Sequence, residues 1–256
     1  MALTTNLVSY YKLDGNSNDA VGSNNGTDTS ITYDNAYGKI NQGALSTASN
    51  KIVTGVTDLA LTTFSISCWF YATADGDFQT LMNKEVSNTN TNRNWYLGQT
   101  PSAGALGFTG KSLLFLASVG GTADVVKVSS TDAITKNSWQ HCVVTRSATE
   151  TKMYINGVLK ETQSYSGSVN TGGTYNNLLQ YSGSTNMGWN GYADEFAIWS
   201  RVLSQTEVSE LYNSGAGNQY PFTTTSIKSI NGLAYASVKS WNGLAKASIK
   251  SINGLE

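Results

Sequence analysis

The strongest constraint on how this chain folds is the alternation of side chains over residues 64–71, FSISCWFY. Phe64, Ile66, Cys68 and Phe70 fill every second position, and polar and aromatic residues fill the positions between them. Successive side chains of a β-strand point to opposite faces of its sheet, so a period of two predicts a strand. This strand should have one strongly apolar face and one mixed face.

Further strand signals follow along the chain. Residues 139–146, WQHCVVTR, show little alternation, which predicts a central strand covered on both faces. Residues 152–162 contain Asn156-Gly157, the dipeptide favoured in two-residue type I′ turns, and so predict a hairpin. Residues 113–119 and 192–199 also have strand character. The spacing of these segments favours a β-sandwich over a βαβ repeat.

The composition agrees with a β fold and excludes several classes of protein. Ser, Thr, Asn and Gly are abundant beside 14 Tyr and 6 Trp, a mixture typical of strands joined by polar turns. Only 13% of residues are charged and the net charge is -1, which gives no indication of a nucleic-acid-binding protein. Two prolines and 25 glycines argue against a proline-rich stalk or a collagen. The 256 residues suffice for one large β domain, alone or with an appendage.

One helix interrupts the strands. Ser204-Gln-Thr-Glu207 has the form of a capping box, in which the Ser hydroxyl and the Glu carboxylate satisfy each other's backbone N–H groups. An apolar stripe follows at positions i, i+3 and i+4, and Gly215 stands where a glycine would end the helix. The stripe comprises Val208, Leu211 and Tyr212. We expect a short surface helix, and we interpret the polar runs 83–95 and 165–190 as long loops.

Several motifs in order resemble one known family. They are LVSYYKLDGNSNDAVGSNNGT at 7–27, FSISCWFYA, SWQHCVVTR, MYINGVLKET, and GYADEFAIWSRVLSQTEVSELYNSG at 191–215. This order is similar to the laminin-G-like branch of the concanavalin A-like jelly rolls, over residues 5–222. The resemblance implies an all-β fold, a two-sheet antiparallel jelly-roll sandwich, with one short helix near 204–214. Binding of glycans or protein partners is the commonest role in that family, often with one structural calcium ion.

The resemblance also implies which residues would hold calcium. In the family pattern an acidic residue at the position of Asp19 and one in the late Asp-Glu-Phe strand, here Asp194, share the ion, and Asp14 and Asn16 are further candidates. Calcium prefers six to eight oxygen ligands, mostly carboxylates and carbonyls. The alternative is an Asx-rich turn that bonds its own backbone, with Asp194 as a solvated strand residue.

The residues do not predict an enzyme. The Glu-x-Asp-x-x-Glu string of the jelly-roll glucanases is absent from the sequence. Asp194 and Glu195 are adjacent, so on a regular strand they would point to opposite faces and could not act as a pair. His141 is the only histidine, and we interpret it as a structural residue of its strand.

Sugar binding would need aromatic faces that stack on sugar rings, with polar groups that fix the hydroxyls. The polar runs supply the aromatic candidates. We take Trp95, Tyr96, Tyr175 and Trp189 as the ligand-binding set, with Tyr165 and Tyr181 as further candidates. The alternative is that Trp95 and Tyr96 begin a strand and pack in the core.

Two cysteines are too few for a disulfide scaffold. Cys68 and Cys142 both fall in predicted buried strands, and we expect them to be free thiols. The N-terminus, MALTTNLVSYYKLDG, lacks the basic and apolar regions of a signal peptide, and no run approaches the length of a membrane span. We therefore expect a protein made in a cytoplasm and released, if at all, by assembly or lysis.

The chain ends in a tandem repeat. SIKSINGLAYA, SVKSWNGLAKA and SIKSINGLE give Asn-Gly at 231–232, 242–243 and 253–254, which predicts three hairpins at a spacing of eleven residues. So small a β-meander has little core of its own and must bury one face against something else. Residues 222–226, Phe-Thr-Thr-Thr-Ser, have the character of a linker, so we expect residues 223–256 to form a separate module that docks on other protein chains. The predicted assembly residues are Ile227, Ile230, Leu233, Val238, Trp241, Leu244, Ile249 and Ile252.

These features lead to two hypotheses about function. The repeat resembles termini of phage and mobile-element surface proteins, so the first hypothesis is a virion component, a capsid decoration or a tail or fibre protein that displays a glycan-binding jelly roll. The second is a secreted or cell-surface bacterial adhesin or carbohydrate-binding module. A glycoside hydrolase would need an acidic pair in a cleft.

Overall fold

The computed structural model describes residues 1–47, 49–55, 62–74, 78–85, 93–100, 112–120, 122–131, 134–167, 169–170, 175–181 and 187–222, and four short segments beyond them, 229–230, 233–234, 240–241 and 244–245. The chain divides into two compact units, Met1–Tyr220 and Pro221–Glu256. No helix in the described segments is long and apolar enough to cross a membrane.

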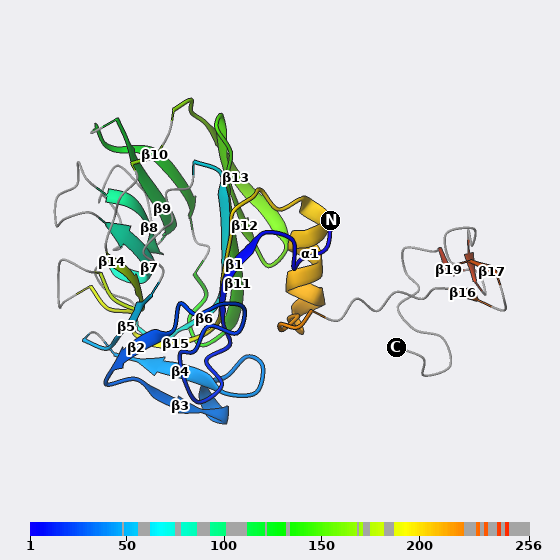
Figure 1. The fold of residues 1–256 in the computed structure, drawn as a ribbon, viewed down its shortest axis with the longest axis horizontal. Coiled ribbons are helices and arrows are strands. Elements are labelled where there is room, and N and C mark those ends of the chain that lie inside the picture. Colours follow the sequence, from blue (N-terminus) through cyan, green and yellow to red (C-terminus); the bar gives the residue numbers. More distant parts are fainter. Residues whose placement is uncertain are drawn as a thin grey trace. The chain divides into compact units, whose positions relative to one another are not determined.

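The first unit consists of two antiparallel sheets packed face to face (Figure 1). The eight-stranded sheet has the order β13-β12-β11-β6-β15-β4-β3, and β1 pairs with β15. Its strands are β1 (Leu7–Tyr11), β3 (Thr32–Asp34), β4 (Gly43–Ser46), β6 (Phe64–Ala72), β11 (Trp139–Arg146), β12 (Glu150–Ile155), β13 (Val158–Ser164) and β15 (Gly191–Trp199). The seven-stranded sheet has the order β10-β9-β8-β7-β14-β5-β2. Its strands are β2 (Gly26–Thr29), β5 (Lys51–Thr54), β7 (Gln79–Glu85), β8 (Arg93–Gln99), β9 (Ser112–Val119), β10 (Thr122–Thr131) and β14 (Tyr175–Leu178). The predicted all-β sandwich is thus confirmed.

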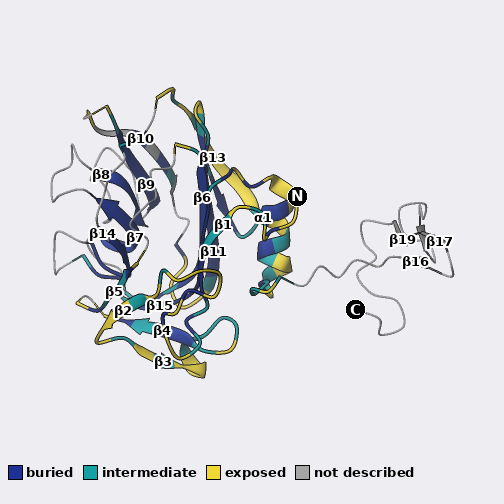
Figure 2. Cartoon of the chain, viewed as in Figure 1, coloured by how far each residue is buried: buried dark blue, intermediate teal, exposed yellow. Residues whose placement is uncertain are grey.

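The core lies between the sheets, where the buried side chains of both layers meet (Figure 2). The apolar set of β6, which the alternation identified, belongs to this core in full. β11 is buried along nearly its whole length on both faces, as its lack of alternation predicted. Cys68 of β6 and Cys142 of β11 are directly opposite each other across the strands, as free and fully buried thiols. Burial raises the pKa of both thiols, which keeps them protonated.

The predicted hairpin and helix are both present. Asn156 and Gly157 have φ of 52° and 78° between β12 and β13, the left-handed pair that a type I′ turn requires. Helix α1 (Gln205–Tyr212) begins with the capping box of Ser204 and Glu207 and covers the outer face of the eight-stranded sheet (Figure 1). The helix ends earlier than predicted, because Asn213 and not Gly215 takes the left-handed conformation of the cap, with φ of 45°. A short 3-10 turn, η4 (Asn213–Gly215), follows, and another, η1 (Asn35–Tyr37), precedes β4.

The polar runs predicted as loops contain strands, so that interpretation was wrong in part. The run 83–95 includes the end of β7 and the start of β8, and the run 165–190 includes β14. These strands carry amide and charged side chains on buried positions, so neither hydrophobic alternation nor an apolar run marks them.

Candidate functional site

A β-bulge in β15 places two carboxylates on one side of the eight-stranded sheet. Asp194 pairs with Trp69 and Ala197 with Ser67, so β15 holds one residue more than β6 between these pairs, and Glu195 has φ of 54°. Glu195 lines the same outer cavity as Trp69, Ser67 and Ala197. The expectation that neighbouring residues point to opposite faces is therefore wrong here, because the bulge breaks the period of two.

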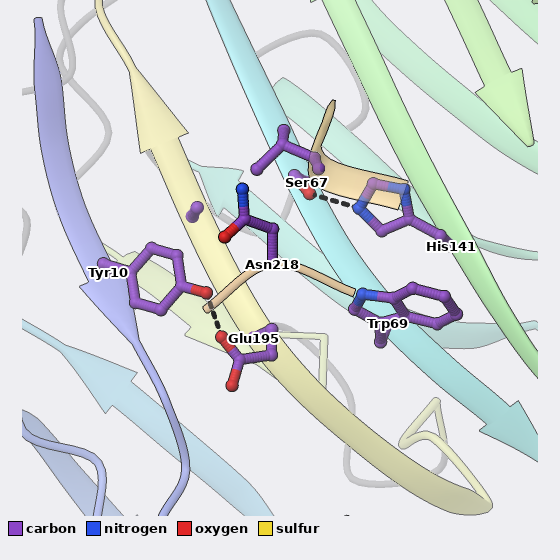
Figure 3. A pocket seen from close by; sticks show the side chains of 8 residues that line it. Tyr10, Ser67, Trp69, His141, Glu195 and Asn218 are labelled. Carbon is purple, nitrogen blue, oxygen red and sulfur yellow. Dashed lines mark hydrogen bonds between the residues drawn. The ribbon is translucent and has the colours of Figure 1, made fainter. Parts of the chain in front are cut away.

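Glu195 is the centre of a buried polar cluster on this outer face (Figure 3). Its carboxylate accepts hydrogen bonds from the Tyr10 hydroxyl and, at 2.6 Å, from Nε2 of Gln219. The same Nε2 donates to Oδ2 of Asp14 at 3.1 Å. Burial raises the pKa of Glu195 to about 8 and also raises that of Asp194. Gln219 thus ties the end of the first unit to β15 and to the loop after β1.

The cavity beside Glu195 has a volume of about 10 Å³, the size of one water molecule. His141 lies in its wall with Nε2 at 2.8 Å from Oγ of Ser67 (Figure 3), while Nδ1 has no hydrogen-bond partner among the described residues. Burial lowers the pKa of His141 to about 3, so the ring is neutral, and it lies 4.9 Å from the Trp69 ring. An acidic pair is thus present, but a sugar ring needs a site of several hundred Å³.

The residues proposed for calcium do not fit the ion. Oδ1 and Oδ2 of Asp19 accept from the N–H groups of Tyr10, Val21 and Asn24, at 3.0, 3.0 and 3.3 Å. Asp194 accepts from the N–H groups of Lys39, Ile40 and Glu195, at 2.8, 2.9 and 2.9 Å. Within the described ranges no group of three or more His, Cys, Asp or Glu could hold a metal.

The other two proposed calcium ligands also have different partners. Asp14 accepts from the backbone of Gln42 and from Gln219. Asn16 accepts from the Asn18 N–H, which is the Asx turn that the alternative interpretation described.

A second polar region lies on the outer face of the seven-stranded sheet. One row of paired residues crosses the sheet from β2 to β8: Thr27, Val53, Asn177, Asn83 and Tyr96. Thr27 is exposed and Val53 is half-buried, while the three residues that follow are buried. The row therefore leads from an open edge into a covered centre.

Tyr96 shows which side of the sheet this row is on. Its ring belongs to a small cluster with Leu114, Leu116 and Tyr181 that is separate from the main core. The ring lies over Gly98, where an added Cβ would meet the Tyr96 hydroxyl at 2.3 Å, so this position requires glycine. Directly opposed residues share a face, so Thr80, which pairs with Gly98, belongs to the same outer surface.

Several buried polar atoms of this face have no hydrogen-bond partner in the part of the chain that the structure describes. They include Oδ1 of Asn177, Oγ1 of Thr80 and Oγ of Ser112. Buried polar atoms are nearly always paired, and each one left unpaired costs roughly 1–3 kcal/mol. Such a group of unpaired atoms is typical of a surface that binds water or a polar ligand.

The aromatic residues predicted to bind a ligand are mostly core residues. Trp95 and Trp189 are 2% and 0% exposed and belong to the core between the sheets. Tyr96 is 1% exposed within its outer cluster. The expectation of loop aromatics is therefore wrong for these three, because β8 and the sheet contacts bury them. Tyr175 begins β14, and its side chain lies outside the described residues.

The C-terminal unit contains two of the predicted hairpins. β16 (Ser229–Ile230) pairs with β17 (Leu233–Ala234), and β18 (Ser240–Trp241) pairs with β19 (Leu244–Ala245). Ile230 pairs with Leu233 and Trp241 with Leu244. Each hairpin forms its own two-stranded sheet. Ile227, Val238, Ile249, Ile252 and the third Asn-Gly lie outside the described residues.

Comparison with known proteins places this geometry in a family. A family model described as the concanavalin A-like lectin/glucanases superfamily matches residues 45–209. The chain belongs to this superfamily. The match spans strands of both sheets and most of α1, so it covers the sandwich and not the C-terminal repeat. No curated protein matches the chain.

Solved structures with this superfamily fold are similar at low sequence identity. Domain 4 of an extracellular GH43 arabinanase from Geobacillus stearothermophilus, solved with arabinotriose, has 21% identity and a TM-score of 0.61, over 79% of this chain and 96% of that one. The binding domain of a Paraclostridial mosquitocidal protein has 18% identity and a TM-score of 0.60, over 84% of this chain and 53% of that one. The receptor-binding domain of botulinum neurotoxin type G has 17% identity and a TM-score of 0.57, over 81% and 51%. The chain thus spans about half the length of the two toxin domains. At these identities the likeness establishes the fold alone.

Proposed function

We propose that this superfamily member is a non-catalytic sugar-binding protein of a phage virion, a capsid decoration or a tail or fibre protein, attached through its C-terminal repeat. The observation that carries sugar binding is the outer face of the seven-stranded sheet, where polar atoms without partners in the described ranges share a face with Tyr96. Hydroxyl, amide and tyrosine side chains are the groups that fix sugar hydroxyls and rings. The arabinanase domain solved with arabinotriose and the toxin binding domains support a binding role.

The geometry of the row suggests how a sugar would reach these atoms. The open end at Thr27 and Val53 admits a ligand along the sheet, and Asn177 is the first buried residue that it would meet. Oδ1 of Asn177 would accept a hydrogen bond from a sugar hydroxyl. Amides and hydroxyls both donate and accept hydrogen bonds, so the expected ligand is an oligosaccharide bound through its hydroxyl groups.

A glycan array tests this proposal, with the wild-type protein and Asn177→Ala compared on the same slides. Loss of one buried hydrogen bond should weaken binding about tenfold, as measured by calorimetry on the best glycan. Asn41→Ala is the control, since exposed Asn41 lies in the loop before β4 and is bonded to Gln219 and Asp14, so this variant should bind as wild type. Equal loss in both variants, or no glycan bound at all, would contradict the proposal.

The attachment role has its own test. Hairpins with two residues in each strand have too little interior to be stable alone, so the repeat should need a partner surface. Deletion of residues 223–256 should leave a folded sandwich and a smaller particle in light scattering. A truncated protein that fails to fold would mean that the repeat belongs to the sandwich core.

The virion origin is tested separately. Capsid, portal or tail genes beside this one would support it. A neighbourhood of secretion genes would instead favour a surface adhesin.

A further inference from the structure

Two carboxylates fix short N-terminal segments of the backbone beside the eight-stranded sheet. Asp19 collects the N–H groups of Tyr10, in β1, and of Val21 and Asn24, in the loop after it. Asp194, in β15, collects the N–H groups of Lys39 and Ile40, which come from a loop more than 150 residues earlier in the chain. Asp19 thus reinforces the backbone bridge between Tyr11 and Asp19, and Asp194 joins β15 to the loop before β4.

The number of donors decides whether a cation could share these oxygens. An ionised carboxylate offers about four lone-pair positions, and each of these two groups already accepts three N–H bonds. Calcium needs six to eight oxygens, so one free lone pair from each carboxylate supplies little of its coordination. The backbone N–H groups also direct their positive ends at the carboxylate. They thus supply the electrostatic stabilisation that a bound cation would otherwise provide.

The burial of the two carboxylates also argues against a bound cation. Asp194 is 0% exposed and Asp19 is 7% exposed. A buried charge is stable only when it is paired or hydrogen-bonded, and here the backbone provides the bonds. A cation at either site would have to displace N–H groups that would then be buried without acceptors.

We infer that Asp19 and Asp194 are backbone staples that replace a structural calcium ion at the positions where the family resemblance places it, and that this protein folds without the metal. The staples fix the loop after β1 and the 39–40 segment by hydrogen bonds from backbone N–H groups. The inference concerns stability alone and is independent of the proposed sugar binding.

Thermal unfolding of the full chain, in calcium chloride and in EDTA, tests the inference first. The wild-type melting temperature should be equal in the two buffers, and calorimetric titration with calcium should give no heat of binding. A site occupied at a hundred times its dissociation constant would instead raise the melting temperature by about 5–10 °C. Such a rise would overturn the inference if Asp19→Asn or Asp194→Asn removed it.

The same two variants test the staples. An amide keeps the size of the side chain but turns an N–H donor toward backbone donors, so each variant should melt about 5–10 °C lower in both buffers. Asp34→Asn is the control, because exposed Asp34 accepts one N–H bond, from Ala36, and its loss should matter much less. Variants that melt as wild type in both buffers would refute the staples. If a variant fails to fold in either buffer, that loss supports the staple, and the wild-type titration still decides on calcium.

Discussion

The outer faces of the two sheets are both rich in buried polar groups, but the two faces differ in whether those groups have hydrogen-bond partners in the described residues. On the eight-stranded sheet, beneath α1 and residues 213–220, the buried carboxylates of Asp194, Glu195 and Glu207 all accept hydrogen bonds from named donors. On the seven-stranded sheet, Asn177, Thr80 and Ser112 carry atoms without partners in the described ranges. We call the first the closed face, because its carboxylates have partners within the chain, although Nδ1 of His141 has none in the described residues. We call the second the open face, because the three atoms named have no partner there.

The difference separates structural groups from binding groups. A perturbed pKa, a strained bulge and an adjacent acid pair are features typical of active sites, and all three occur at Asp194 and Glu195. Yet these groups are bonded to Tyr10, Gln219 and backbone, around a cavity of about 10 Å³. The less conspicuous open face carries ordinary amides and hydroxyls, and several of their atoms have no partner among the residues that the structure describes.

The largest expected loss of stability comes from substitution of Arg201, on the closed face. Its guanidinium forms a bidentate ion pair with Glu207, at 2.7 and 2.9 Å, and donates to the backbone oxygens of Ala2 and Thr5. Arg201→Met leaves Glu207 buried without its cation and should lower the free energy of unfolding by about 3–5 kcal/mol. Denaturant titration measures this loss.

The double variant Arg201→Met with Glu207→Leu provides the control. It removes both charges, so it should recover part of the stability that the single variant loses. Sugar binding by the folded fraction should stay unchanged, since the pair lies on the closed face. A single variant as stable as wild type would mean that this ion pair does not hold the face closed.

The sequence predicts the layers of this fold better than its polar surfaces. Alternation in residues 64–71 and the Asn156-Gly157 turn report on hydrophobic burial and on backbone conformation, which are local properties, and both predictions are confirmed. β7 and β14 were missed because their buried positions carry amides and charges, which hydrophobic alternation does not mark.

The candidate sites were harder to predict because they depend on one bulge and on strand register. Glu195 faces the same side as Asp194 only because β15 contains an extra residue, which composition and spacing do not reveal. The row from Thr27 to Tyr96 joins five strands that are distant in sequence. The abundance of Asn in the runs that we interpreted as loops could have indicated these strands. Amides at strand positions are typical of a sheet face that forms hydrogen bonds through its side chains.

The pH dependence of stability tests the closed face at His141. Burial lowers the pKa of His141 from 6.5 to about 3, so protonation favours the unfolded chain. The stability that neutral His141 contributes is complete above pH 6.5 and is lost as the pH falls toward 3, with a slope of up to about 1.4 kcal/mol per pH unit. His141→Gln should flatten this acid limb relative to wild type in denaturant titrations at several pH values. Parallel curves for the two proteins would contradict a neutral, buried His141.

The smallest change in stability should come from a substitution of Thr80, on the open face. Its hydroxyl is fully buried, and Oγ1 has no partner in the described ranges, so Thr80→Val removes a polar atom and keeps the shape of the side chain. Removal of an unpaired buried hydroxyl should leave stability within about 1 kcal/mol of wild type, and a small gain is expected. Ser65→Ala is the matched control on the closed face, where Oγ of Ser65 donates to Arg201 O and accepts from Leu203 N, so that variant should be the less stable of the two. If Thr80→Val costs as much as Ser65→Ala, the hydroxyl of Thr80 is already bonded in the free protein, and the contrast between the two faces disappears.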